Sequence, residues 1–537
     1  MKTKIFLCLI VLIACSFLLS AQELQFKDIS SEVAKPQKLK NWQVSIKERA
    51  DDNFILSSVA PYRLFITDKN LNIIQNITLP EEYKKMDISY LCRLGNHHLV
   101  LIAKGYKKMQ LGLLNEHFDL IKTYLLSPKW AFMRLICKDS NYAYLNVNGN
   151  TFIKVDENLN IIAQRDNVAN LYSNNWTAHI EGDTLFLKLS NTLTLFDKNN
   201  FNTFSSVKFK YSSENNSPTN PSYHRIIYGK NKIAEFGTHR ILQGWNYVDD
   251  FYAYLYDYNK QLQEFTVNST YDKTEGTDQI LDAVFDEHEN LVLARLWRKW
   301  EKSDKERQYS NPYLTFTIIS ENGIETIDYG EFEKGLCTPI YLLKVENKEA
   351  VLCYGKQSEY KVIAIDMQRL TNRTLLTQTC NFEVANLKPT YTNKWENKSG
   401  YLLEFTQNIK LSNISGNQNT YYDMINTLIY INKDFTTTTQ YRSKQYTGMT
   451  HFFFNDVKSD KKDNYFLLDH AEPHYSGKSR NYYHTDSQYY LINQQGQFRM
   501  LDLGSDVSLL PYQHNKYYVL KNYYKTNTYK LSHLEIR

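Results

Sequence analysis

The side chains best suited to chemistry in this 537-residue chain are aromatic rings, histidines and arginines that gather in four long segments. The segments are residues 236–250, 298–312, 406–426 and 469–488. Aromatic faces stack on sugar rings or pack against a protein partner, and arginine donates paired hydrogen bonds to a carboxylate or sulfate. We therefore expect a ligand-binding surface, with Arg307 beside it, formed by Arg240, Trp245, Tyr247, Arg298, Trp300, Tyr309, Tyr421, Tyr422, His474, Tyr475, Arg480, Tyr482, Tyr483 and His484.

Other interpretations of these residues remain open at this point. The aromatic rings could instead pack their own segments onto the body of the protein. His474 and His484 could form a general acid and base pair or bind a metal. Ten residues apart in one segment, they match no local motif, so we interpret them as ordinary polar groups and predict neither a metal nor a cofactor.

A repeated pattern supplies the elements that must position these segments. Residues 68–74 read DKNLNII and residues 156–162 read DENLNII, each after a short apolar run. An apolar run, a polar turn and a second run are typical of a β-hairpin, because Asp, Asn and Gly accept tight-turn dihedral angles. Looser copies bring the count to nine; they begin at Leu111, Leu193, Ala253, Leu314, Val362, Leu428 and Tyr489.

Two further short strands precede most of these hairpins. Residues 90–94 and 97–104 read YLCRL and HHLVLIAK, upstream of the hairpin that begins near Leu111. Four consecutive antiparallel strands per repeat make one blade of a β-propeller. The middle runs are apolar on both faces, as expected when a sheet lies between two other sheets.

The mature chain resembles the general β-propeller superfamily over nearly its whole length. It contains no WD dipeptide, sialidase box, kelch double glycine or YWTD motif, so the resemblance implies a fold and assigns no functional residue. The fold class that it implies is all-β, with four-stranded antiparallel blades in one large ring of about eight or more, or in two smaller propellers that split near residues 270–280. Three final strands and the early run LQFKDIS predict closure by a terminal strand.

The repeat register places all four long segments between the second and third strands of their blades. Segments that long are more often functional or mobile than incidental, so we expect them to be loops that carry the binding surface. The leading hypothesis is a binding or scaffold module for a glycan, peptide or partner protein. One alternative is a polysaccharide lyase or glycoside hydrolase with its site at the propeller centre, and another is a structural part of a cell-envelope assembly.

The first 21 residues have the layout of a secretory signal peptide, with two lysines, an apolar run and a cleavage point after Ala21. They predict export to the periplasm, the cell surface or the medium. Alternatively, residues 12–15 resemble a bacterial lipobox, which would make Cys15 a lipidation site and the protein an outer-membrane lipoprotein. No later segment is long and apolar enough to span a membrane.

The cysteine count and the net charge indicate the state of the thiols and the class of partner. The five later cysteines, an odd number, predict at least one free thiol or an intermolecular bond; they are Cys92, Cys137, Cys337, Cys353 and Cys380. The formal net charge is +5 without any block of basic residues, which argues against nucleic acid as a partner. We expect a monomer.

Overall fold

The structure is a computed structural model. For some strand residues only the backbone is described. The described residues are 24–28, 33–34, 44–50, 53–59, 62–77, 79–83, 86–103, 109–127, 133–166, 176–189, 192–208, 224–230, 232–243, 246–257, 262–267, 276–301, 308–309, 312–333, 336–356, 359–379, 389–411, 422–442, 446–449, 454–457, 464–473, 485–501, 503, 507–513, 515–523, 526 and 528–536.

The strands in these ranges form ten antiparallel sheets, each with four main strands. No α-helix occurs among the described residues, and one short 3-10 helix, η2, covers Glu81–Tyr83. This arrangement of consecutive four-stranded antiparallel sheets is a β-propeller, which confirms the predicted fold class.

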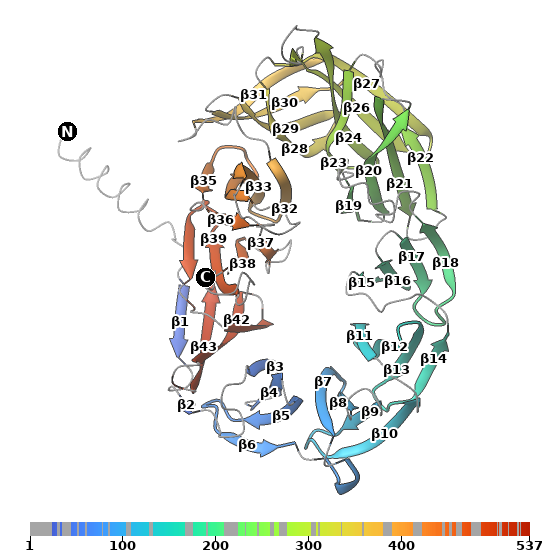
Figure 1. Cartoon of the computed structure of the whole chain (residues 1–537), viewed down its shortest axis with the longest axis vertical. Helices are drawn as coiled ribbons and strands as arrows, with labels where there is room; N and C mark the ends of the chain where they lie inside the picture. The colour runs from blue at the N-terminus through green and yellow to red at the C-terminus, as the bar shows by residue number, and fades with distance from the viewer. Residues whose placement is uncertain are drawn as a thin grey trace, which may run out of the picture. The chain divides into compact units, whose positions relative to one another are not determined.

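The chain divides into two compact units. The first contains residues 1–210, 471–488 and 501–537, and the second contains residues 211–470 and 489–500. The predicted split near residues 270–280 and the choice between one ring and two propellers stay predictions. Figure 1 shows that consecutive sheets within each unit follow one another in chain order.

The first unit holds five sheets. Its strands are β3 (Val44–Ala50), β4 (Asn53–Val59), β5 (Tyr62–Thr67) and β6 (Ile73–Asn76); β7 (Asp87–Leu94), β8 (His97–Ala103), β9 (Met109–Leu114) and β10 (Leu120–Ser127); β11 (Met133–Lys138), β12 (Tyr142–Val147), β13 (Thr151–Asp156) and β14 (Ile161–Arg165); β15 (Trp176–Glu181), β16 (Thr184–Leu189), β17 (Thr192–Asp197) and β18 (Thr203–Lys208); and β41 (Val507–Gln513), β42 (Lys516–Tyr523), β43 (Thr528–Ile536), β1 (Leu24–Asp28) and β2 (Val33–Ala34).

The second unit holds four sheets and most of a fifth. Its strands are β19 (His224–Tyr228), β20 (Lys232–Gln243), β21 (Asn246–Asp257) and β22 (Leu262–Val267); β23 (Gly276–Phe285), β24 (Leu291–Glu301), β25 (Gln308–Tyr309), β26 (Tyr313–Ser320) and β27 (Gly323–Glu331); β28 (Leu336–Glu346), β29 (Glu349–Lys356), β30 (Glu359–Asp366) and β31 (Thr371–Thr379); β32 (Pro389–Glu396), β33 (Gly400–Leu411), β34 (Tyr422–Asn432), β35 (Thr438–Arg442) and β36 (Tyr446–Met449); and β37 (Phe454–Val457), β38 (Phe466–Pro473), β39 (Thr485–Ile492) and β40 (Phe498–Leu501).

The nine predicted hairpins are the third and fourth main strands of nine sheets. They are β5–β6, β9–β10, β13–β14, β17–β18, β21–β22, β26–β27, β30–β31, β34–β35 and β39–β40. The tenth sheet confirms the predicted closure: its strand order is β1-β43-β42-β41, and β1 pairs with β43 from Leu24↔Ile536 to Asp28↔Ser532. The final three strands therefore obtain their fourth strand from the early part of the chain, which leaves no open edge on β43 along this pairing.

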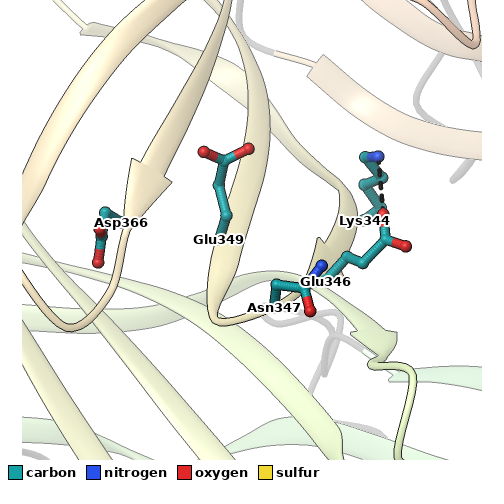
Figure 2. Close-up of a pocket in the computed structure, with 5 residues that line it drawn as sticks. All are labelled: Lys344, Glu346, Asn347, Glu349 and Asp366. Atoms are coloured by element: carbon teal, nitrogen blue, oxygen red, sulfur yellow. Dashed lines mark hydrogen bonds and ion pairs between the residues drawn. The ribbon is translucent and has the colours of Figure 1, made fainter.

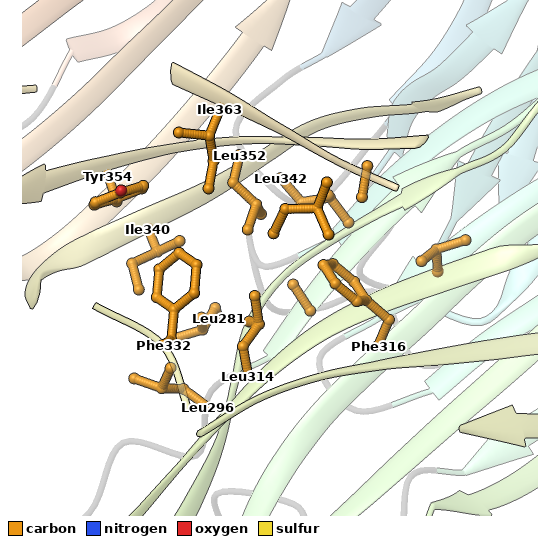
Figure 3. Packing of buried hydrophobic residues seen from close by; sticks show 14 of the residues in the cluster. Leu281, Leu296, Leu314, Phe316, Phe332, Ile340, Leu342, Leu352, Tyr354 and Ile363 are labelled. Atoms are coloured by element: carbon orange, nitrogen blue, oxygen red, sulfur yellow. The ribbon is translucent and has the colours of Figure 1, made fainter. Parts of the chain in front are cut away.

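Neighbouring sheets within each unit pack face to face through apolar side chains. In the second unit the run LVLA of β24 shows the alternation: Leu291 and Leu293 belong to the cluster shared with the β19–β22 sheet, whereas Val292 and Ala294 contact the β28–β31 sheet. Figure 3 shows the latter cluster, in which Phe316 and other apolar residues fill the space between two sheets. A strand that is buried on both faces explains why these runs lack a polar alternation.

The repeated phrase DKNLNII builds the turn between the third and fourth strands. Asp68 Oδ1 accepts hydrogen bonds from the backbone N–H groups of Asn70 and Asn72, at 2.8 and 2.9 Å. Leu71 then adopts a left-handed backbone with φ of 66°, and its side chain is fully buried. A left-handed leucine costs on the order of 1–2 kcal/mol, which burial of the side chain, at about 1.5–3 kcal/mol, offsets.

The same device recurs in other turns. In each, a bulky apolar residue with positive φ is buried between its own sheet and a neighbour. These residues are Phe118 (φ 64°), Leu159 (φ 57°), Phe201 (φ 58°) and Phe435 (φ 56°). In these five turns, the recurring element is therefore a buried apolar residue with positive φ that anchors one sheet to the next.

We expect Leu159→Ala to lower the free energy of unfolding by about 2–5 kcal/mol, because it removes a side chain that is 1% exposed and leaves a cavity between two sheets. Ile162→Ala, three residues further along and 47% exposed, is the matched control and should change stability by less than about 0.5 kcal/mol. Urea denaturation checks both variants. Equal losses for the two would contradict the anchoring role of the turn.

Polar side chains add a second tie between neighbouring sheets in the first unit. A residue of one outer strand donates a hydrogen bond to a backbone carbonyl in the turn of the next sheet. The pairs are Gln75 Nε2 to His117 O (3.3 Å), Lys122 Nζ to Asn158 O (3.0 Å) and Arg165 Nη1 to Phe201 O (2.6 Å). The turns are therefore fixed from both sides, and this polar pattern serves structure.

Candidate functional site

All four long segments singled out in the sequence lie between the second and third main strands of their sheets. They connect β20 to β21, β24 to β26, β33 to β34, and β38 to β39. The predicted register is therefore confirmed. We call the side of each sheet on which the second strand ends and the third begins the insertion side.

The largest described feature on this side is a hairpin whose two strands extend beyond the other strands of their sheet. Strands β20 and β21 pair over twelve positions, from Lys232↔Asp257 to Gln243↔Asn246. Among the described residues their outer neighbours cover less of this length, since β19 begins opposite Gly237 and β22 ends opposite Phe251. In the part of the chain that the structure describes, residues 238–243 and 246–250 pair only with each other, and we call this extension the β20–β21 arm.

Two other sheets of the second unit extend in the same way. Strands β33 and β34 pair as far as Leu411↔Tyr422, and β36 lines the end of β34. Strand β24 runs beyond its last pair with β26, and there Trp300 pairs with Tyr309 of the short strand β25. Insertions in these sheets thus lengthen the central strand pair toward the insertion side.

This finding corrects the expectation that the segments are loops. Much of each segment is strand: residues 236–243 and 246–250, 298–301 and 308–309, 406–411 and 422–426, and 469–473 and 485–488. The physical reason is that a long excursion must pair its backbone N–H and C=O groups, and the nearest available partner is the other half of the same excursion. Strand pairing fixes the directions of such segments more firmly than a loop would.

The structure places part of the predicted binding residues. Arg240 lies opposite Asp249, and Tyr247 opposite Leu242, in the β20–β21 arm. For some, namely Arg240, Tyr247, Trp300, Tyr309 and Tyr422, the strand position is described and the side chain is not. Outside the described residues lie Trp245, Arg307, Tyr421, His474, Tyr475, Arg480, Tyr482, Tyr483, His484 and the lipidation candidate Cys15 with the rest of the signal segment.

Arg298 is the one predicted binding residue whose side chain is described. It is partly exposed and lies opposite Thr277 of β23. The neighbouring Trp297 is buried and packs edge-on against Tyr313, with ring centroids 5.6 Å apart. The base of the β24 extension is therefore packed. Arg298 is the first residue of β24 beyond its last pair with β26.

A buried ion pair connects the first strands of three sheets, and sequence reasoning missed it. Lys394 Nζ on β32 lies 2.7 Å from Asp282 Oδ2 on β23 and donates to the carbonyl of Leu342 on β28 at 2.6 Å. The side chains are 14% and 1% exposed, respectively. Asp282 also accepts from the backbone N–H groups of Leu342 (3.0 Å) and Ala283 (2.9 Å).

These contacts give Asp282 and Lys394 a structural role. Asp282 comes directly after a β-bulge, where the register of β23 against β24 shifts between Ile280 and Asp282. Bulges re-aim side chains and are often found near functional sites. Here the carboxylate of Asp282 accepts hydrogen bonds from Lys394 and from two backbone amides. The pair of Asp282 and Lys394 therefore joins neighbouring sheets. A strand that reads GTDQILDAVF offered no sequence signal for it.

A polar hollow lies at the other end of the β28–β31 sheet, where first strands turn into second strands. It measures about 320 Å³ and is lined by Lys344, Glu346, Asn347, Glu349 and Asp366 (Figure 2). Lys344 lies 3.1 Å from Glu346, and Arg373 contacts both carboxylate oxygens of Glu349 at 2.9 and 3.0 Å. Backbone hydrogen bonds from Arg369 are the main cause that lowers the pKa of Asp366.

Such a hollow can hold a cationic or hydroxylated group by hydrogen bonds, but Asp366 is too acidic for a general acid at neutral pH. Among the residues that the structure describes, no group of three or more His, Cys, Asp or Glu side chains is placed to hold a metal ion. Cys92, Cys137 and Cys353 form no disulfide bond, and burial is the main cause that raises the pKa of Cys137 to about 12. That thiol is therefore unreactive.

The turn carboxylates predict a pH dependence of stability. Burial raises the pKa of Asp68 and Asp156, but hydrogen bonds from Asn72 and Asn160 lower it more, so both lie below the ordinary value of 3.8. A lowered pKa in the folded state stabilises above the unfolded value and is lost as the pH falls through the folded value.

We therefore expect stability to fall as the pH drops from about 4 toward 2, with a shallower fall in the double variant Asp68→Asn, Asp156→Asn, which keeps the accepting side-chain oxygen. Urea midpoints between pH 6 and pH 2.5 measure the effect. Identical slopes for both proteins would show that the two turns do not contribute.

No helix in the described part of the chain is long and apolar enough to cross a membrane. No protein-family model matches the chain, and no curated protein matches its sequence. Solved structures with similar arrangements include BamB from Moraxella catarrhalis, with 10% identity, a TM-score of 0.31, and coverage of 83% of this chain and 96% of that one.

Two further structures are similar to the chain. An exported protein from Bacteroides fragilis is 13% identical, with a TM-score of 0.22, and the alignment covers 51% of this chain and 83% of that one. The WD40 domain of SCAP from fission yeast is 8% identical, with a TM-score of 0.30, and the alignment covers 96% and 98%. At such scores the assignment of the fold rests on the strand pairing described above.

Proposed function

We propose that the protein is an exported binding or scaffold module that engages a glycan, a peptide or a partner protein through the insertion side of its sheets. The observation that supports this function best is the projection of central strand pairs beyond their own sheets in the second unit. Two-stranded hairpins are marginally stable on their own. Strand length beyond the four-stranded part of a sheet is therefore more useful for contact with a ligand than for the stability of that sheet.

The chemistry of the projecting segments supports binding as well. The arm and the neighbouring extensions carry Arg240, Tyr247, Trp300, Tyr309 and Tyr422 at described strand positions. Tyr, Trp and Arg are the residues that contribute most to contacts with proteins and sugars. In contrast, Asp282 and Lys394 on the first strands of two sheets are engaged with each other and with backbone groups.

Export is part of this proposal. The layout of residues 1–21 supports a signal peptide cleaved after Ala21, with lipidation of Cys15 as the alternative. Mass spectrometry of the mature N-terminus distinguishes the two, because cleavage before a lipidated Cys15 adds the mass of the acyl chains. A mature chain that still contains residues 1–21 would contradict export by either route.

The test is a binding screen of the mature protein on arrayed glycans and on displayed peptides. It compares the wild type with a variant in which residues 239–250 are replaced by Asn-Gly. Thr238 and Phe251 are a register pair, so a two-residue turn can close the shortened hairpin there. The matched control is Glu346→Gln, Asp366→Asn in the hollow at the opposite end of a sheet. We expect the arm replacement, and not the control, to lose ligands.

A further inference from the structure

The early strands that complete the tenth sheet are held by a single neighbour. Residues 24–28 of β1 pair with residues 532–536 of β43, and residues 33–34 of β2 pair with residues 528–529. Figure 1 shows β1 beside β43. In the part of the chain that the structure describes, β43 is the only strand that pairs with β1 or β2. We call residues 24–28 and 33–34 together the closing strap.

The strap lies along one edge of β43, and β42 lies along the other. Strand β42 pairs with β43 from Lys516↔Glu535 to Tyr523↔Thr528, which is nearly the same length of β43 that the strap contacts. If the strap leaves, the backbone N–H and C=O groups on its edge of β43 lose their strand partner. An edge of this kind is a template for another strand.

The rest of the closing sheet is fixed by contacts that do not involve the strap. Strands β41, β42 and β43 pair with one another in sequence. Their buried residues Tyr518 and Leu531 share a core cluster with Phe54 of the β3–β6 sheet. The Tyr529 hydroxyl also donates to the carbonyl of Leu71 at 3.1 Å. Three strands with a packed apolar face meet the requirement for a stable sheet, so we expect these contacts to persist when the strap opens.

No disulfide can lock the strap in place. The chain has no cysteine between Cys15 and Cys92, so the strap itself contains no thiol. Its attachment to β43 is therefore noncovalent and reversible. Short segments at the edge of a structure open at a lower free-energy cost than the whole fold.

The segment that fits the open edge of β43 is the strap of a second copy of the chain. It has the sequence and the register with which β43 already pairs, so exchange requires no new kind of contact. The order of synthesis favours such an encounter, because residues 24–34 are made before residues 528–536 of the same chain. During that interval, a finished neighbouring copy offers the only complete acceptor.

We propose that the closing strap is exchangeable: it leaves β43 while the rest of the first unit stays folded, and the open edge accepts the strap of a second copy as an antiparallel strand. At low concentration the chain's own strap closes the sheet, because the connection through residues 35–43 keeps its effective concentration high. At high concentration the exchange links two copies. This device goes beyond the proposed ligand binding and does not depend on it.

The first test separates the strap from its own chain after folding. A site for a sequence-specific protease is placed within residues 35–43 of the full-length protein, which is folded, cut, and freed of its strap by gel filtration. A labelled peptide of residues 22–34 is then titrated into cut and uncut protein. Two variant peptides are compared with it. Phe26→Ala changes the residue opposite Leu534, which is fully buried, and Lys27→Ala changes the residue opposite His533, which is partly exposed.

We expect the peptide to bind the cut protein at least about tenfold more tightly than the uncut protein, in which the attached strap competes. Phe26→Ala should weaken binding at least about tenfold, and Lys27→Ala less than about threefold. Removal of the strap should speed hydrogen exchange at alternate amides of residues 528–536, since only alternate residues of β43 donate to that edge. The amides of β4 and β5 should stay protected.

The second test is the oligomeric state after refolding. Uncut protein refolded at high concentration should give a dimer fraction that grows with concentration and is separated by size-exclusion chromatography. Cleavage within residues 35–43 should convert these dimers to monomers, because the cut removes the covalent connection between each strap and its own chain. Protein that is cut before it is refolded is the control and should give no such dimers.

Three results would overturn the inference. They are unfolding of β4 and β5 when the strap is removed, equal affinity of the peptide for cut and uncut protein, and refolded protein that forms no dimers or forms dimers that survive cleavage. Each of these results leaves the proposed binding function standing, because that function is tested separately through the β20–β21 arm.

Discussion

Replacement of Lys394 by methionine should lower the free energy of unfolding by about 3–5 kcal/mol, one of the largest effects expected for a single substitution in this chain. The variant removes the lysine that lies 2.7 Å from the carboxylate of Asp282, which is 1% exposed. It also removes the hydrogen bond that the Lys394 ammonium donates to the carbonyl of Leu342 on β28. Three sheets would lose their common tie at once.

The comparison that isolates this pair is a double-mutant cycle with Asp282→Asn. Asparagine keeps an oxygen for the amides of Leu342 and Ala283 and removes the buried negative charge. The double variant should therefore be more stable than the sum of the two single losses predicts, by at least about 1 kcal/mol. Lys398→Met, at an exposed turn position, is the matched control and should change little. Additive losses would show that the two side chains do not interact.

Leu534→Asp should be equally severe, with a loss of more than about 4 kcal/mol or failure to fold. Leu534 is fully buried in β43, opposite Phe26 of β1 and Tyr517 of β42. A carboxylate there has no described partner and would separate the early strand from the final ones. The variant thus tests whether terminal closure contributes to stability.

The same substitution at an exposed leucine serves as the control for closure. Leu125 lies on the outer strand β10 and is 56% exposed, so Leu125→Asp should remain within about 0.5 kcal/mol of the wild type. Thermal and urea denaturation of both variants give the comparison. Similar stability of Leu534→Asp and the wild type would contradict a closure that depends on β1 and β43.

The sequence predicted the strands well because the repeat couples local and global signals. In the phrases DKNLNII and DENLNII, Asp68 and Asp156 specify the turn by side-chain hydrogen bonds, and the following leucines specify which side is buried. Turn chemistry and burial agree at these positions, so hairpin, register and closing strand could all be predicted.

The insertions were harder to interpret, because their polar and aromatic composition is compatible with a loop and with a projecting strand. Residues 236–250 contain Gly237, Gly244 and two aspartates, which suggested turns, yet most of them pair in register as β20 and β21. Pairing of one half of the segment with the other is a long-range property that composition does not show. The ion pair of Asp282 and Lys394 was missed for the same reason, since 112 residues separate its partners.

The most direct test of the central claim, that ligands bind on the insertion side, is the dissociation constant of one ligand from the binding screen, measured for three proteins. These are the wild type, the variant with residues 239–250 replaced by Asn-Gly, and the control Glu346→Gln, Asp366→Asn. The account predicts that the arm replacement weakens binding at least tenfold while the melting temperature and the control's affinity stay unchanged. Equal affinity of the wild type and the arm-replaced protein, with loss of binding in the control, would contradict it.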